Sequence, residues 1–167
     1  MRSDILLKKN KHLPSMPEIQ IVESVIGNRL PDDYVAFMEE YNNFMPDPPR
    51  PICFKVDWKG KKVAPFDEAS IGSWEEINKN KDNSIIEAIK ILWAPSFEII
   101  PHDVIPIGGD GGGGLILLGI SGENYGKVFY WFDGCPYEPG EPSYENIGFV
   151  ANNFTEFLES LYPCDDG

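Results

Sequence analysis

Residues 104–132 read VIPIGGDGGGGLILLGISGENYGKVFYWF, and this stretch decides the class of fold. Three segments rich in apolar residues, at 104–107, 115–120 and 127–132, are separated by glycine-rich turns. Short apolar segments between glycines are typical of β-strands, and residues 115–118 and 129–132 are apolar at every position. Because a strand that is apolar on both faces lies inside a sheet, we expect two central strands with a packed layer on each face.

Helical patterns surround this β-rich centre. Apolar residues recur at the spacing of a helix face in four segments, 17–27, 31–41, 84–92 and 153–161. Pro17 and Pro31 suit the first turn of a helix, because a proline there removes no helical hydrogen bond. Ser84 and Asn153 are the first residues of the last two segments, each with a glutamate three residues later, and are predicted to cap the helices there.

Weaker patterns complete the series of elements. Strands are predicted at 53–58, 63–66 and 147–150, and a short helical turn at 74–77. Together these elements predict an α+β fold, a single domain in which a mainly antiparallel sheet is flanked by helices. The length of 167 residues and the hydrophobic content of 42% are enough for a core without a metal or a disulfide.

The ends of the chain differ in composition from its centre. Residues 1–15 are basic and polar and are expected to form a flexible lead-in. The domain is expected over 16–163, and 164–167 form an acidic tail. Only three apolar residues lie between Asp4 and Lys8, too few for the apolar part of a signal peptide.

Cysteine usage also bears on the compartment. Cys53, Cys135 and Cys164 are odd in number, far apart, and form no C-x-x-C pair, which argues against a zinc knuckle or a thioredoxin-like site. No apolar run approaches the ~20 residues that span a bilayer. We therefore expect a cytoplasmic protein in a reducing environment, with no metal and no membrane contact.

Charge is the most informative feature of the composition. The formal net charge is −13, and residues 91–167 hold 12 acidic side chains and one basic side chain, Lys127, a net of −11. Such a chain repels phosphates, so nucleic acid and anionic lipid are poor candidates for partners. The acidity has two readings: a solvated surface that keeps the protein soluble, or a surface that meets a basic partner.

Two motifs suggest other chemistry, and neither has the context it needs. Residues 109–114 contain G-x-G-x-x-G, but strand-forming residues follow where a dinucleotide site requires a helix, so we expect no nucleotide cofactor. Asp110 is instead expected to hydrogen-bond within the turn. His102 precedes Asp103 and leaves a small hydrolase as a weak alternative, since a catalytic triad needs several matched groups.

The ordered set of motifs resembles the SUKH superfamily, which is named in part for a yeast regulator of cell-wall glucan synthesis. The resemblance covers residues 17–162 and is carried by five pieces: 19–27, 30–42, 105–118, 126–133 and 150–158. The chain departs from the family pattern where Asn42-Asn43-Phe44 follows the second helical segment in place of a glycine, and where the glycine run ends at Gly114 rather than in a polar residue.

The resemblance implies an α+β fold and a role without catalysis. Many bacterial members resemble immunity proteins that bind and neutralise a toxin, often a nuclease, and other members are described as regulators of glucan synthesis. An acidic inhibitor suits a toxin with a basic working face. We therefore expect a cytoplasmic immunity protein with a basic toxin as partner, and a regulatory adaptor in cell-wall or glucan synthesis as the alternative. The expected contact residues lie in the acidic loop after the central strands: Asp133, Tyr137, Glu138, Glu141, Tyr144 and Glu145.

Overall fold

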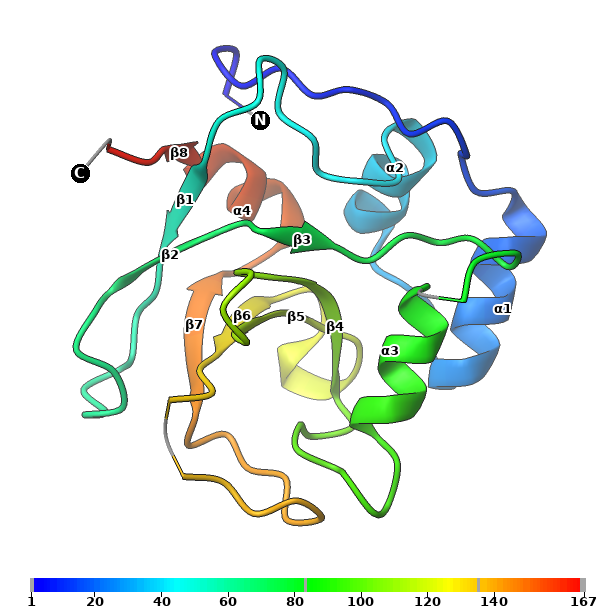
Figure 1. Ribbon diagram of the computed structural model, residues 1–167. Helices are drawn as coiled ribbons and strands as arrows, with labels where there is room; N and C mark the ends of the chain where they lie inside the picture. The colour runs from blue at the N-terminus through cyan, green and yellow to red at the C-terminus, as the bar shows by residue number, and fades with distance from the viewer. Residues whose placement is uncertain (1, 83, 135, 166–167) are drawn as a thin grey trace.

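A computed structural model describes residues 2–82, 84–134 and 136–165 and confirms the α+β class (Figure 1). The helices are α1 (Met16–Ile26), α2 (Asp32–Glu40), α3 (Ile85–Leu92), α4 (Phe154–Ser160) and the short 3-10 helix η1 (Gly122–Asn124). The strands are β1 (Ile52–Lys55), β2 (Glu68–Ser70), β3 (Ser73–Trp74), β4 (Val104–Gly109), β5 (Leu115–Gly119), β6 (Val128–Trp131), β7 (Ile147–Ala151) and β8 (Tyr162–Pro163).

The strands form two antiparallel sheets. The larger has the order β3-β4-β5-β6-β7, so β5 and β6 are interior strands, as their uninterrupted apolar residues predict. The smaller has the order β2-β1-β8, and the chain passes from one sheet to the other at residues 71–72. In Figure 1 the smaller sheet lies to one side of the larger, with α4 close to β1 and β7.

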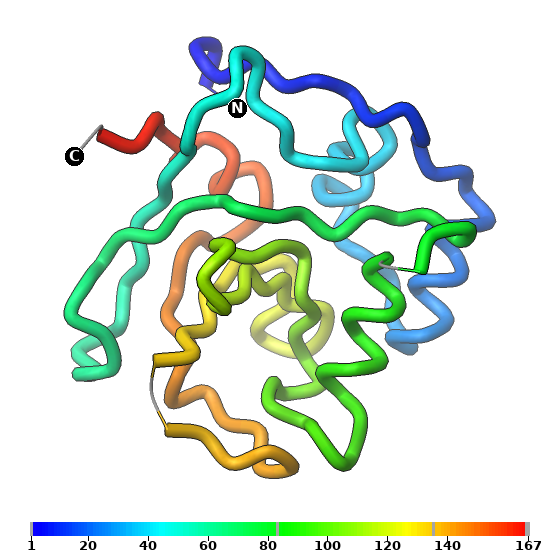
Figure 2. The backbone as a smooth tube through the Cα atoms, viewed as in Figure 1, coloured from blue at the N-terminus to red at the C-terminus, as the bar shows by residue number. Residues whose placement is uncertain are grey.

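Each face of the larger sheet has its own core. One face, with Ile105, Ile116 and Tyr130, packs against the helices and the smaller sheet. The opposite face carries Leu117, Phe129 and Trp131 and is covered by the residues around Ile99 and by the loop that leads into β7. In Figure 2 these two covering loops run side by side at the bottom of the molecule, and the backbone N–H of Gly140 bonds to the carbonyl of Glu98 at 2.7 Å.

Helix ends follow the local sequence in three cases and depart from it in one. Ser15 accepts a hydrogen bond from the Glu18 backbone and forms a complete capping box with it, and Asn153 accepts one from Glu156. Ser84 begins α3 without a side-chain hydrogen bond, although the sequence there matches a capping box. Gly27 ends α1 in the left-handed conformation, with a φ of 71°.

The glycine run makes the turn between β4 and β5. Asp110 Oδ1 accepts hydrogen bonds from the backbone N–H groups of Gly112 and Gly114, at 2.7 and 3.0 Å, as the sequence predicts. Gly111 and Gly113 have φ values of 80° and 108°, which favour glycine. The run thus closes a hairpin, and a strand follows it rather than the helix of a dinucleotide site.

Two local predictions were wrong. Residues 74–77 do not form a helical turn, because the chain there is extended and β3 pairs with Gly108 and Gly109 of β4. Residues 63–66 are not a strand, and the pairing with β1 starts only where the Asp67 carbonyl accepts from the Val56 backbone at 2.8 Å. The predicted strand residue Phe66 instead packs edge-on against Phe132, with ring centroids 4.9 Å apart.

The N-terminal segment differs from the flexible lead-in that its composition predicts. Ile5 is 1% exposed, within the main core. Backbone N–H groups of Lys8 and Asn10 bond to the carbonyls of Met45 and Tyr41, both at 2.8 Å. The segment is therefore held in two ways: the Ile5 side chain is buried in the core, and the backbone forms hydrogen bonds with the end of α2 and the loop after it.

Two of the three cysteines are joined. Cys53 on β1 and Cys164 after β8 form a disulfide across a sequence separation of 111 residues. The sequence does not predict this pair, because the two cysteines are far apart in the chain and come together only when β8 pairs with β1. The third, Cys135, lies outside the described residues, as do the last two residues of the acidic tail. Among the described residues no helix has the length and apolarity that crossing a membrane requires.

Candidate partner-binding surface

The acidic loop between β6 and β7 is held in place by aromatic side chains. Tyr137 packs edge-on against Trp131 of β6, with ring centroids 5.1 Å apart. Tyr144 packs edge-on against Phe129 at 6.3 Å. Both partners belong to the second core, so the loop rests on the sheet through contacts that its own sequence provides.

A hollow of about 220 Å³ lies between this loop and the sheet. Its lining comes from three parts of the chain: Ile99, Trp131, Pro136, Tyr137, Glu138, Glu141, Ser143, Glu145 and Asn146. Trp131 is 3% exposed and Ile99 is 6% exposed, so they supply a buried apolar wall. Tyr137 is 40% exposed and offers its ring to solvent beside the glutamates.

The charged side chains that line the hollow are all acidic. Glu138, Glu141 and Glu145 are exposed, and within the described part of the chain none of them is in an ion pair. The nearby Lys61 amine is engaged elsewhere, since it donates hydrogen bonds to the backbone carbonyls of Tyr144 and Ile147, at 2.8 and 2.5 Å. Burial lowers the pKa of Lys61, while the charge of Glu145 acts in the opposite direction.

The structure thus brings four of the six predicted contact residues together: Tyr137, Glu138, Glu141 and Glu145. Tyr144 faces another direction. Its hydroxyl donates a hydrogen bond to the Asp103 carboxylate and accepts one from Asn124 Nδ2 at 2.9 Å. Burial, together with the bond to Asp103, raises the pKa of Tyr144 above its usual value. Tyr144 therefore ties the loop to the rest of the domain.

Asp133 also lies apart from the hollow. Its carboxylate sits over Gly113 in the turn between β4 and β5, where a side chain on that residue would collide with it. The other lining residues were not among the predicted contacts. Trp131 belongs to the segment 129–132, which the sequence predicts as a buried central strand, and Ile99 carries no local signal because the contact joins segments more than thirty residues apart.

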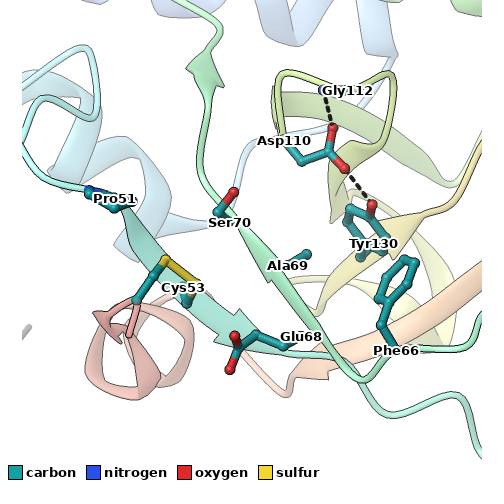
Figure 3. A pocket seen from close by; sticks show the side chains of 10 residues that line it. Pro51, Cys53, Phe66, Glu68, Ala69, Ser70, Asp110, Gly112 and Tyr130 are labelled. Carbon is teal, nitrogen blue, oxygen red and sulfur yellow. Dashed lines mark hydrogen bonds between the residues drawn. A yellow bond between two sulfur atoms is a disulfide. The ribbon is translucent and has the colours of Figure 1, made fainter. Parts of the chain in front are cut away.

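A second, larger hollow of about 510 Å³ lies beside the glycine run (Figure 3). Asp110 and Glu68 contribute its carboxylates, and both are already in use. Asp110 accepts from the Tyr130 hydroxyl at 2.5 Å as well as from the turn, and Glu68 pairs with Lys55 at 3.1 Å. Burial and the Asp110 bond raise the pKa of the Tyr130 hydroxyl above its usual value.

His102 occupies a packing position. Its ring stacks on Trp93, with centroids 4.6 Å apart, and its Nε2 pairs with the Glu98 carboxylate. The neighbouring Asp103 is bound to Tyr144 and Asn124. Among the described residues no group of three His, Cys, Asp or Glu side chains is placed to hold a metal ion.

Comparison with known proteins places most of the chain in one family pattern. The model of the SMI1 / KNR4 family (SUKH-1) matches residues 14–160. The chain is also 26% identical over 151 residues to the SPbeta prophage-derived uncharacterized protein YokK of Bacillus subtilis (strain 168), an alignment that covers 86% of this chain and 72% of that protein. The matched range includes the four α-helices, the smaller hollow and the acidic loop, whereas Cys164, which lines the larger hollow, lies beyond it.

Proposed function

This chain belongs to the SMI1/KNR4 family (SUKH-1), and from that premise we propose that it is an immunity protein that binds and neutralises a basic bacterial toxin. A nuclease is the toxin class that fits best, because an enzyme that holds nucleic acid presents a basic surface. In this proposal the chain acts in the cytoplasm and by contact alone, without catalysis. Blocking the toxin's working face is all that the mechanism requires.

One observation carries the proposal: three glutamates that have no ion-pair partner in the described part of the chain surround a hollow on a loop anchored to the core. Charged groups that lack partners in the free protein are available to a partner, and an anchored loop loses little entropy when it binds. The exposed ring of Tyr137 lies among them, and tyrosine is enriched at protein interfaces. Asp133 adds to the acidic field, and Tyr144 supports the loop from behind.

The genetic setting offers a simple observation. The similar Bacillus protein is described as derived from a prophage. An immunity protein is useful only beside its toxin, so the proposal expects the reading frame just upstream to encode a large protein with a toxin-like C-terminal domain. A cell-wall enzyme there would favour the regulatory adaptor instead.

Co-expression tests the proposal directly. The toxin-like domain from the neighbouring frame is induced in cells that also make this chain. We expect the wild-type chain to restore growth, and the triple variant Glu138→Lys, Glu141→Lys, Glu145→Lys to fail at equal abundance.

The matched control reverses three other exposed glutamates that are in no ion pair among the described residues, Glu39, Glu123 and Glu159. This control keeps the same change in net charge and is expected to protect. Failure of the wild-type chain to protect contradicts the immunity function. Full protection by the loop variant contradicts the assigned surface.

A further inference from the structure

We infer that the hollow of about 220 Å³ beside the acidic loop receives one arginine side chain of the partner. The inference rests on the proposed function and names the chemistry of the contact. Arginine is singled out because its planar guanidinium stacks on aromatic rings and donates paired hydrogen bonds to carboxylates.

Tyr137 supplies the stacking surface, because its ring is 40% exposed, while Trp131 is 3% exposed and packs against it. Trp131 and Tyr137 meet edge-on, so their rings stand at an angle to one another along the hollow. A cation over such a ring is attracted by the negative face of its π-system. Ile99 extends the wall and suits the apolar stem of a long side chain.

The backbone that carries the three glutamates is held by hydrogen bonds within the loop. The Glu141 backbone N–H bonds to the Glu138 carbonyl at 3.0 Å, which keeps the two side chains in one turn. The Glu145 backbone N–H bonds to Ser143 Oγ at 3.0 Å. Fixed backbone positions reduce the entropy that is lost when a partner binds, so the acidic rim is prepared for a cation.

Comparison with the hollow beside the glycine run shows why this one is selected. In the larger hollow Asp110 and Glu68 already accept hydrogen bonds from side chains of this protein. In the smaller hollow none of the three glutamates is in an ion pair among the described residues, and the Lys61 amine near Glu145 donates its hydrogen bonds to backbone carbonyls. A volume of about 220 Å³ also lies below the ~300–1,000 Å³ that is typical of small-molecule sites, and a single side chain is the occupant of matching size.

The experiment uses the chain alone with a capped tripeptide, glycine–arginine–glycine, followed by amide NMR. Two other peptides replace the arginine by lysine or by citrulline, which keeps the shape of arginine without its charge. We expect saturable shifts confined to the residues around Trp131, Tyr137 and Glu145. Binding should be about tenfold weaker for citrulline and several-fold weaker for lysine.

Variants of the protein test whether arginine binds at this hollow or is attracted only by the overall negative charge. Replacing the three loop glutamates by glutamine should weaken arginine binding about tenfold, while Glu39→Gln, Glu123→Gln and Glu159→Gln should leave it unchanged. Tyr137→Phe should bind nearly as well as the wild type, and Tyr137→Ala several-fold less well. Equal shifts with citrulline, or equal losses in the two triple variants, would overturn the inference.

The result is independent of the co-expression test, because no toxin is present. Arginine binding without protection from the toxin would leave the hollow as a cation site and remove the immunity function. Protection without selective arginine binding would keep the function and remove this assignment.

Discussion

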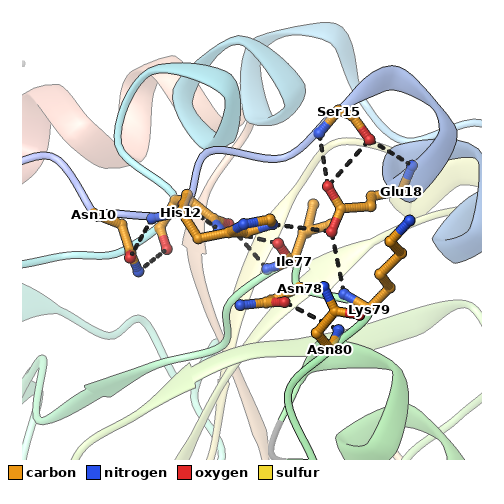
Figure 4. A network of polar contacts seen from close by, with 9 residues as sticks. Asn10, His12, Ser15, Glu18, Ile77, Asn78, Lys79 and Asn80 are labelled. Atoms are coloured by element: carbon orange, nitrogen blue, oxygen red, sulfur yellow. Dashed lines mark hydrogen bonds and ion pairs between the residues drawn. The ribbon is translucent and has the colours of Figure 1, made fainter.

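At the scale of single residues, Glu18 is the clearest case of a charge held inside the fold (Figure 4). Its carboxylate is 4% exposed and accepts hydrogen bonds from the backbone of Ser15 at 2.8 Å and of Lys79 at 3.2 Å. His12 Nε2 lies 2.9 Å from it. Burial opposes ionisation, but these hydrogen bonds outweigh burial and lower the pKa of Glu18 to about 2.

The lowered pKa of Glu18 predicts a pH-dependent stability. Since the pKa in the unfolded chain is higher, the ionised form stabilises the fold by about 3 kcal/mol above about pH 5, and this is lost as the pH falls toward about 2. The free energy of unfolding should therefore differ most between wild type and Glu18→Gln near neutral pH. The difference should narrow in acid.

Urea unfolding at a series of pH values measures this difference. Glu39→Gln, at an exposed position, is the control and should track the wild type throughout. A gap between wild type and Glu18→Gln that stays constant with pH would show that the charge of Glu18 does not stabilise the fold.

At the scale of elements, α4 joins the helices to both sheets. Phe157 is fully buried, and its ring lies 5.7 Å from Phe54 of β1 and 5.8 Å from Phe154. Phe157→Ala should cost ~3–5 kcal/mol in the free energy of unfolding, because it leaves a cavity between the helix and the smaller sheet.

Chemical denaturation of Phe157→Ala beside Glu159→Ala, an exposed position on the same helix, checks this. The control should stay within about 0.5 kcal/mol of the wild type. An unchanged unfolding midpoint for Phe157→Ala would mean that α4 does not dock as described.

The Cys53–Cys164 disulfide ties β8 to β1 and gives a second prediction for the elements. Closing so long a loop should stabilise the fold by about 2–4 kcal/mol. Reductant and Cys164→Ser should each lower the urea midpoint of the wild type, and reductant should have no further effect on the variant. Cys135→Ser should keep the sensitivity to reductant.

A wild-type midpoint that is the same with and without reductant would show that the bridge does not form in solution. The pair also bears on the compartment, since stable disulfides are rare in a reducing cytosol. Rapid alkylation of the protein in cells would count its free thiols. One free thiol per chain would mean that the Cys53–Cys164 bridge is formed and that the compartment is oxidising. Three free thiols would mean that the bridge is reduced, as expected in the proposed cytoplasm.

The elements that the sequence predicts well are those with local causes. The four helices and the strands of the larger sheet from β4 to β7 follow from apolar spacing, proline and glycine. β3 and β8 were missed because two residues become a strand only through a partner far along the chain, such as Gly108 for Trp74. The disulfide was missed for the same reason.

The candidate surface, too, could be predicted from the sequence only in part. Acidic residues and tyrosines in one loop could be found from composition, and the structure gathers Tyr137 with three glutamates. Tyr144 reads as an equal candidate in the sequence, yet its hydroxyl is bound to Asp103. Which tyrosine faces solvent depends on contacts across the chain that no local pattern encodes.

At the scale of the whole molecule, the net charge of −13 governs how the protein meets a partner. A charged surface raises the rate of encounter with an opposite charge, and salt screens the effect over about 10 Å at 0.1 M. Rim charges change the association rate, while a buried anchor changes the dissociation rate. The proposed function therefore predicts a fast, salt-sensitive association that depends on the loop.

The association rate constant of the cognate pair, measured across a salt series, tests this central claim most directly. For the wild type and for the Glu39, Glu123 and Glu159 reversal, the rate should fall about tenfold or more as salt is raised. The reversal of Glu138, Glu141 and Glu145 should associate several-fold more slowly at low salt, with a weaker dependence on salt. If that variant associates at the wild-type rate at low salt, the acidic loop is not the contact surface.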